Sequence, residues 1–210
     1  MSELTLYNFD LDENCYRVRL LLGMLGIACK LVSVDMVPGF EHKKAPLLAL
    51  NPLGDLPILA DGDFVVNGFV PSLIYVARRA GASAWAPSGD ARTDALLASW
   101  LAFAASELKS AREARLVSLF GFPGDLKALR GAGRGALRVM EDHMTRRSYE
   151  GAEFFVSGNP TIADLALLPA FALSRDWGVG HEGYPALRRW LRRVRTLPGF
   201  KTMPGVPDYY

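Results

Sequence analysis

Cys15 lies at the start of the first helix that the sequence predicts, a place where a thiol can be reactive. The positive end of a helix dipole lowers the pKa of a nearby thiol, and the thiolate is the form that makes mixed disulfides. Asp12 and Glu13 counteract this effect, because carboxylates destabilise a neighbouring anion. Asn14 offers an amide N–H to an anion and is also suited to cap the helix. The segment predicts either a redox site at Cys15 or ordinary packing of that side chain.

A second group of residues, 51–59, joins a turn signal to an apolar strand that one proline interrupts. Pro57 follows Leu56 and cannot donate to a sheet, so it should lie at an edge, a strand start or a tight turn. A cis peptide bond is the usual reason for such a placement, at a cost of about 0.5–1 kcal/mol. We therefore predict a cis Leu56-Pro57 bond.

The elements that must position these residues alternate between strand and helix. The patterns predict strands over 4–7 and 28–34, a helix over 15–25 between them, and a helical patch over 42–50. Strands over 56–60 and 64–66 form a hairpin around Asp61-Gly62, and a helix follows over 70–79. The first part should therefore be an α/β domain with a sheet that is parallel first and antiparallel later.

The second half of the sequence reads as helical throughout. Residues 80–90 are rich in Gly, Ser, Ala and Pro and suit a linker. Helices are expected over 92–119, 125–148, 161–174 and 184–196, although Gly131, Gly133 and Gly135 weaken the second of these. Thr161 and Asp164 have the spacing of a capping box. We therefore expect a domain over 1–79, a linker over 80–90 and an all-helical domain over 91–210.

Both halves resemble the glutathione transferase family, of the bacterial, cytosolic type. The resemblance is carried by the strand–helix opening with segment 51–59 and by Pro160-Thr161-Ile162-Ala163-Asp164, and residues 184–187 and 197–200 are similar to the family's closing helix. It covers the whole chain and implies a thioredoxin-like domain followed by an all-helical one. It also implies a homodimer that uses glutathione with a small hydrophobic or acidic electrophile. The peptide before the cis proline binds the cysteinyl backbone in this family, which places Leu56 and Pro57 in the glutathione site.

Near the sulfur of glutathione, this chain differs from the family pattern. Close relatives read Ser-Gly-Asn where this chain has Asp12-Glu13-Asn14. An ionised Asp12 cannot donate to a thiolate and would repel it, by about 4 kcal/mol at 4 Å and an effective dielectric of 20. Asn14 keeps a donor, so the resemblance makes Asn14 and Asp12 the candidate catalytic residues, with Cys15 as the alternative. Tyr7 on the first strand is similar in place to tyrosines that activate the thiol in some classes, so it is a candidate contact to substrate, but strand tyrosines more often pack in the core.

At both ends of glutathione, this chain also differs from the family in the residues that anchor the ligand. The γ-glutamyl group is held in the family by an acidic residue and a serine, and the corresponding positions here are Gly68 and Phe69. At the glycyl end the resemblance implies a contact from His42, while Asp55 has the wrong charge for a carboxylate. The glutathione site is therefore expected to be degenerate and weak.

The electrophile should contact the first long helix of the second half. Arg112 and Arg115 lie on it and could bind an acidic substrate, or could form a solvated face. Three functions stay open: a glutathione transferase with a remodelled site, a binding or regulatory module without catalysis, and a thiol-disulfide reductase that uses Cys15.

Composition limits the other partners. The net charge of +2 is too small to indicate nucleic acid, and no apolar run approaches the roughly 20 residues of a membrane span. The three histidines and two cysteines lack metal-ligand spacing, so no metal is expected. With no secretory signal and few cysteines, a cytoplasmic location is expected.

Overall fold

The N-terminal half contains a mixed four-stranded sheet. The computed structural model describes residues 3–204 and 206, and its strands are β1 (Leu4–Asn8), β2 (Cys29–Ser33), β3 (Ile58–Asp61) and β4 (Phe64–Asn67). Their order is β2-β1-β3-β4. The β1–β2 pair is parallel, whereas β1–β3 and β3–β4 are antiparallel. The predicted sheet is thus confirmed, with Asp61 opposite Phe64 at the hairpin turn.

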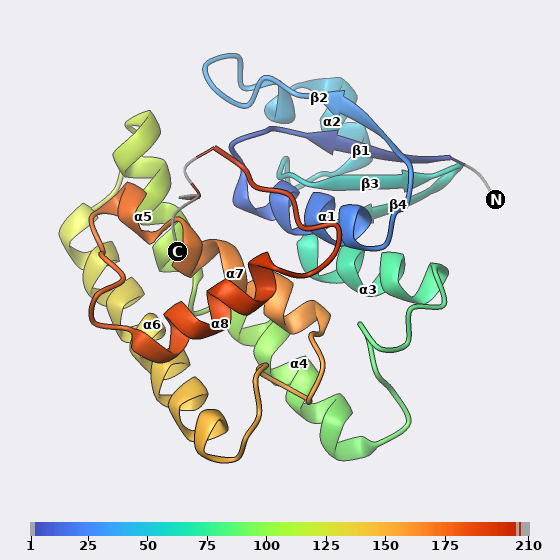
Figure 1. The fold of residues 1–210 in the computed structure, drawn as a ribbon. Helices are drawn as coiled ribbons and strands as arrows, with labels where there is room; N and C mark the ends of the chain where they lie inside the picture. The colour runs from blue at the N-terminus through green and yellow to red at the C-terminus, as the bar shows by residue number, and fades with distance from the viewer. Residues whose placement is uncertain (1–2, 205, 207–210) are drawn as a thin grey trace.

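Helices cover the two faces of this sheet unequally (Figure 1). The helices α1 (Glu13–Met24) and α3 (Phe69–Arg79) lie on the face toward the C-terminal half, and the short 3-10 helix η1 (Glu41–Lys43) and helix α2 (Ala45–Leu50) lie on the other face. Alternation in β1 explains the arrangement, because Leu4 and Leu6 are buried while Thr5 and Tyr7 are half-buried. Helix α1 begins two residues before its predicted start, since Asp12 provides the N-cap.

The C-terminal half consists of helices in the described residues. These are α4 (Ala91–Ala105), α5 (Lys109–Phe120), α6 (Leu126–Tyr149), α7 (Ile162–Ala172), the 3-10 helix η2 (Ser174–Trp177) and α8 (Pro185–Arg195). The expectation of one helix over 92–119 is wrong. The carbonyl of Phe103 accepts from both Glu107 N at 3.0 Å and Leu108 N at 3.3 Å, so the helical register shifts by one residue. The shift buries Leu108 and starts α5 in a new orientation.

Helix α7 is the centre of the molecule. The capping box at its start is confirmed, with Thr161 N donating to Asp164 Oδ2 at 2.8 Å. The same carboxylate accepts from Phe155 N at 3.1 Å and from Trp190 Nε1 at 2.9 Å. Helix α7 packs against α1, α3 and α4, and one apolar cluster runs from the sheet through α7 to α8. The two halves therefore share a core that fixes the surfaces between them.

Among the described residues, none of the helices combines the length and the apolar composition needed to cross a bilayer.

Candidate functional site

The backbone of Leu56 and Pro57 is the first part of the candidate site. Their peptide bond is cis, as predicted, and Pro57 O accepts from Gly68 N at 3.0 Å. The Leu56 side chain packs in a small cluster with Cys15, Val34 and Ile58. Within the described residues neither the N–H nor the C=O of Leu56 makes a hydrogen bond. Leu56 therefore presents a free backbone donor and acceptor, which an extended peptide can pair with.

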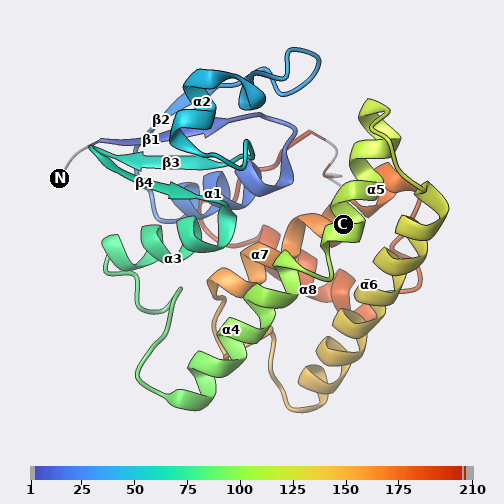
Figure 2. The same cartoon turned by 180° about the vertical axis from the view of Figure 1, so that it is seen from behind.

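A cleft of about 200 Å³ lies between the first turns of α1 and α3 and the junction of α4 and α5. Asp55 lines it, whereas its neighbour Leu56 is 2% exposed and borders the cleft without lining it. Figure 2 shows this junction from behind, beside the ends of α1 and α3. The lining side chains combine polar and apolar groups: Asn14, Arg17, Asp55, Phe69, Ala104, Ala105, Leu108, Lys109 and Arg112. Residues far apart in the sequence thus form one pocket where the two halves meet.

Of the candidate site residues, Asp12 has the environment that differs most from the one the sequence predicts. Its side chain is fully buried, with Oδ1 accepting from Cys15 N at 2.9 Å and Oδ2 accepting from Arg112 Nη2 at 2.6 Å. Burial raises the pKa of Asp12, but Arg112 and the Cys15 N–H outweigh burial and the net pKa is lowered. The carboxylate also raises the pKa of Arg112 against the opposing effect of burial. Arg112 therefore offsets much of the negative charge that the sequence predicts would repel a thiolate.

Asn14 lies on the cleft wall and is not the N-cap, which corrects the alternative prediction for it. Its Oδ1 accepts from Arg17 Nη1, while no described residue accepts from its Nδ2. This amide can therefore donate to a ligand in the cleft.

Cys15 is fully buried in this structure. Burial is the main reason that the pKa of its thiol is raised well above the ordinary value, and the adjacent Asp12 raises it further. Of the two alternatives predicted for Cys15, the structure favours packing, because Sγ points into the small core cluster, 4.0 Å from Tyr7 O, and Asp12 counteracts the helix start as expected.

Gly68 and Phe69 start α3 at one end of the cleft. Gly68 is the N-cap of α3, with φ 84° and no side-chain cap. The ring of Phe69 lines the cleft, and the Arg17 guanidinium lies 4.4 Å from its centroid. Burial lowers the pKa of Arg17 to about 10, and its Nε donates to Ala166 O of α7 at 2.7 Å. Sequence reasoning missed Arg17, and the pattern alone could not single it out, because Arg19 lies among the same apolar residues and stays partly exposed.

Of the two residues expected near the glycyl end, Asp55 lines the cleft, whereas His42 is not among the lining residues. His42 is 6% exposed, and no described residue bonds its buried Nδ1. Burial, and next Lys43, lower the pKa of this imidazole, which is then neutral at neutral pH. Asp55 Oδ1 lies 3.9 Å from Lys43 Nζ in an exposed ion pair, so its charge is only partly offset.

Two further predicted contacts lie away from the cleft. Tyr7 lines a different pocket, with Val32, Pro46 and Leu47 on the α2 side of the sheet. Arg115 is buried, and it donates to Asp176 Oδ2 at 2.7 Å and to Leu11 O at 2.6 Å. These placements correct the prediction that Tyr7 and Arg115 contact substrate. Arg115 instead connects the β1–α1 loop to the C-terminal half.

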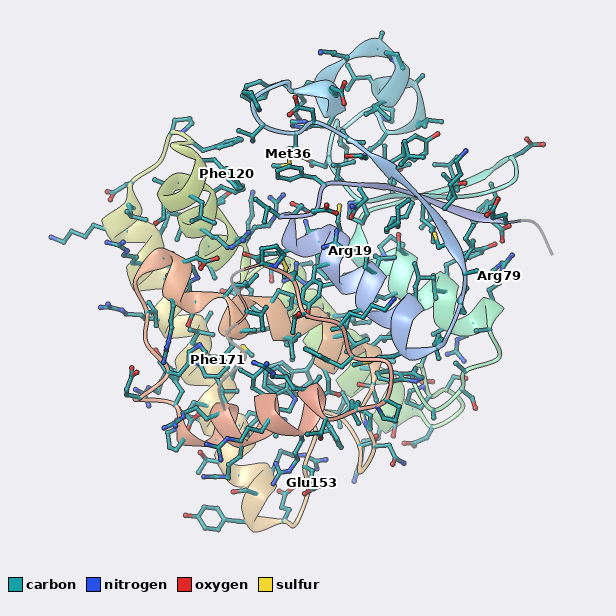
Figure 3. The ribbon with its side chains drawn as sticks, turned by 45° about the horizontal axis from the view of Figure 1, so that its top comes forward. Arg19, Met36, Arg79, Phe120, Glu153 and Phe171 are labelled. Carbon is teal, nitrogen blue, oxygen red and sulfur yellow. The ribbon has the colours of Figure 1, made fainter. Side chains whose placement is uncertain are left out.

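A second cavity, of about 390 Å³, also includes Arg112 in its wall. Most of its lining is apolar and comes from α5, α6 and the loop between them, including Leu116, Val117, Phe122 and Leu129. Aromatic contacts join this end of α5 to the N-terminal half: the ring centroids are 6.0 Å apart for Phe9–Phe120 and 6.2 Å for Phe40–Phe122. Figure 3 labels Phe120 on α5 and Met36 on the N-terminal side of this region. Arg112 thus borders both cavities.

The described residues hold no group of three or more His, Cys, Asp or Glu side chains that could bind a metal ion.

Comparison with known proteins agrees with this architecture. Two family profiles match, Glutathione S-transferase, N-terminal domain, over residues 6–70 and Glutathione S-transferase, C-terminal domain, over residues 111–193. Human glutathione S-transferase theta-2 is 30% identical over 195 residues, which are 83% of this chain and 73% of that protein.

Solved structures have the same fold. A glutathione S-transferase from Pseudomonas fluorescens superposes with TM-score 0.86 at 26% identity, over 97% of this chain and 100% of that one. A glutathione transferase homolog from Lodderomyces elongisporus, with two glutathione molecules per subunit, superposes with TM-score 0.83 at 22% identity, over 95% and 96%. The chain belongs to the glutathione S-transferase family.

Proposed function

We propose that this protein binds glutathione weakly through the backbone of Leu56 and conjugates it, at low efficiency, to a small hydrophobic or acidic electrophile. The observation that carries the proposal is the unpaired N–H and C=O of Leu56 before the cis bond to Pro57. An extended cysteinyl residue can pair with both groups, as an added strand does at a sheet edge. Membership of the family, and glutathione in the Lodderomyces homolog, support this choice of ligand.

The sulfur of such a ligand would lie near Asn14 and Arg112. The free Nδ2 of Asn14 can donate to a thiolate, and the Arg112 guanidinium offsets the charge of Asp12. A hydroxyl donor is missing from the residues that line the cleft, so we expect modest thiol activation. Each lost charge-assisted hydrogen bond costs about 1.5–3 kcal/mol, so losing two anchors brings a micromolar site to about millimolar affinity.

The electrophile would occupy the cavity between α5 and α6. Its apolar lining suits a hydrophobic compound, and Arg112 at its edge suits an acidic group. The thiolate would form a bond to carbon, and a leaving group such as chloride would depart.

A binding module without catalysis is a second candidate. Asp12 favours it, because its carboxylate already accepts from Cys15 N and Arg112 and can give no hydrogen to sulfur. A reductase that uses Cys15 is the least supported function, since the thiol is buried.

Calorimetric titration with reduced glutathione and a conjugation assay with a chloronitrobenzene test the proposal. We expect millimolar affinity and slow chloride release, and no binding would refute it. Binding without turnover would favour the second candidate, a binding module without catalysis.

Asp55→Gln should improve the affinity for glutathione by about threefold, because it removes a charge that opposes the glycyl carboxylate. The matched control is Asp63→Gln on the exposed β3–β4 turn, which should leave affinity unchanged.

We also retain three broader proposals. The domain boundaries at 1–79, 80–90 and 91–210 agree with the end of α3 at Arg79 and the start of α4 at Ala91. A homodimer would cover the apolar groove of about 400 Å³ that Val70, Ile74 and Leu97 help to line on α3 and α4. The cytoplasm is the proposed compartment, because it keeps thiols reduced.

A further inference from the structure

Phe69 makes one end of the cleft apolar. Its side chain is 9% exposed, and the Arg17 guanidinium packs against its ring. The neighbouring wall consists of Ala104, Ala105 and Leu108, which present carbon atoms to the cleft. A charged group placed at this end would lose its hydration against this surface.

Most charged side chains around Phe69 face an opposite charge within the protein, although the buried Glu13 oxygens accept no hydrogen bond from the described residues. Arg17 Nη2 lies 3.8 Å from Glu13 Oε2, and Arg112 Nη2 lies 2.6 Å from Asp12 Oδ2. Both carboxylates are buried, with side chains 1% and 0% exposed, so neither can reach an ammonium group of a ligand. At the rim, Lys109 Nζ lies 3.6 Å from Glu113 Oε1.

The start of α3 offers few groups to a zwitterion. Gly68 has no side chain that could accept from an ammonium, and Pro71 has no N–H for a carboxylate. The hydroxyl of Ser72 donates to Gly68 O at 2.7 Å, so its hydrogen is already used by the helix. For its zwitterionic end, glutathione is therefore left with the N–H groups of Phe69 and Val70 and with the exposed Asp55, a weak replacement for lost hydration.

We propose that this cleft prefers a cysteinyl peptide whose N-terminal acyl group is uncharged, with that group packed against Phe69. The inference rests on the proposed function, because the cysteinyl residue is still held by the backbone of Leu56. Glutathione binds in the same register but must desolvate its zwitterionic end. The preference deepens the proposed function by naming the class of thiol that suits the remodelled site.

The test compares reduced glutathione with N-butanoyl-L-cysteinylglycine, which lacks only the α-amino and α-carboxylate groups. Calorimetric titration of the full chain should give the butanoyl peptide at least about threefold higher affinity. Equal or weaker affinity than that of glutathione, or a smaller gain, would overturn the inference and leave the proposed function standing. If neither thiol binds, the pairing at Leu56 fails, and both proposals fail with it.

Two variants test the assignment to Phe69. Phe69→Ser supplies a hydroxyl for the α-carboxylate and should shift the affinity ratio about tenfold toward glutathione. Phe69→Leu keeps an apolar wall and should keep the preference of the natural chain. An unchanged ratio in folded Phe69→Ser, verified by a thermal melt, would overturn the role of Phe69. The comparison of the two thiols in the natural chain decides the preference even where a variant is unstable.

Discussion

At the scale of single residues, the Asp12–Arg112 pair changes the interpretation of the site. Sequence comparison treats Asp12 as a negative charge that repels a thiolate. In the structure the carboxylate is buried, caps α1 and bonds Arg112, which lies 100 residues later in the chain. Asp12 therefore connects the two halves of the molecule, and replacing it does not simply remove a repulsive charge.

This pair predicts a specific pattern of stabilities. Arg112→Leu should reduce the free energy of unfolding by about 3 kcal/mol, because it leaves a buried carboxylate without its partner. Asp12→Ser retains a capping hydroxyl and should cost less, since Arg112 is 23% exposed. In denaturant titrations, the loss of unfolding free energy in the Asp12→Ser/Arg112→Leu double variant should be about 1–2 kcal/mol smaller than the sum of the two single losses. Additive losses would contradict the pairing.

The same pair predicts a pH dependence. Because folding lowers the pKa of Asp12, the pair stabilises the fold above the ordinary carboxyl pKa of about 4 and loses this contribution as the pH falls through the folded value. The double variant should lose less stability than the natural chain below about pH 4, as measured by urea unfolding at several pH values.

Cysteine reactivity gives another prediction at this scale. Cys29 is half-buried and has a pKa raised to about 11, chiefly by desolvation, whereas Cys15 is fully buried. Iodoacetamide should modify Cys29 slowly and Cys15 only after unfolding, as peptide mass spectrometry can follow. Cys29→Ser is the control that isolates Cys15. Rapid modification of Cys15 in the native protein would restore the reductase hypothesis.

At the scale of elements, the glycines of α6 show how packing outweighs helix propensity. Gly131, Gly133 and Gly135 weaken the sequence prediction equally, yet α6 runs unbroken from Leu126 to Tyr149. A Cβ on Gly133 would come within 2.9 Å of the Trp177 ring, whereas a Cβ on Gly131 or Gly135 would meet nothing within 4 Å. Of these three glycines, only Gly133 lies where the neighbouring side chain leaves no room for a Cβ.

Alanine substitutions test this distinction. Gly133→Ala should lower the free energy of unfolding by about 1–3 kcal/mol, because Trp177 must move. Gly131→Ala and Gly135→Ala should raise it by up to about 1 kcal/mol, since alanine favours the helix. Denaturant titration of the three variants measures both signs. A stabilising Gly133→Ala would contradict the packing of η2 against α6.

At the scale of the whole molecule, the sequence predicts the fold better than the site. Local signals are sufficient for the hairpin at Asp61-Gly62 and the capping box at Thr161, because the interacting residues are near neighbours. The pairs Asp12–Arg112 and Arg115–Leu11 join residues more than 90 positions apart, and no local pattern predicts them. The break between α4 and α5 was missed for a similar reason, since burial of Leu108 in the core accompanies it.

The proposed dimer is testable at the same scale. Sedimentation at micromolar concentration should show a particle of twice the 23.0 kDa chain mass. Ile74→Arg in the α3–α4 groove should give monomers, because a charge would be buried in the interface. Val139→Arg, at an exposed apolar residue of α6, is the matched control and should leave the dimer intact. A monomeric natural chain would refute the proposal.

The central claim is that glutathione pairs with the backbone of Leu56 in the interdomain cleft. A titration of the ¹⁵N-labelled protein with reduced glutathione, followed by amide resonances, tests it most directly. The account predicts that the Leu56 amide and the Asn14 side-chain amide shift together, with half-saturation at about millimolar concentration. Unchanged resonances of Leu56 at the highest soluble concentration, or saturation at micromolar glutathione, would contradict it.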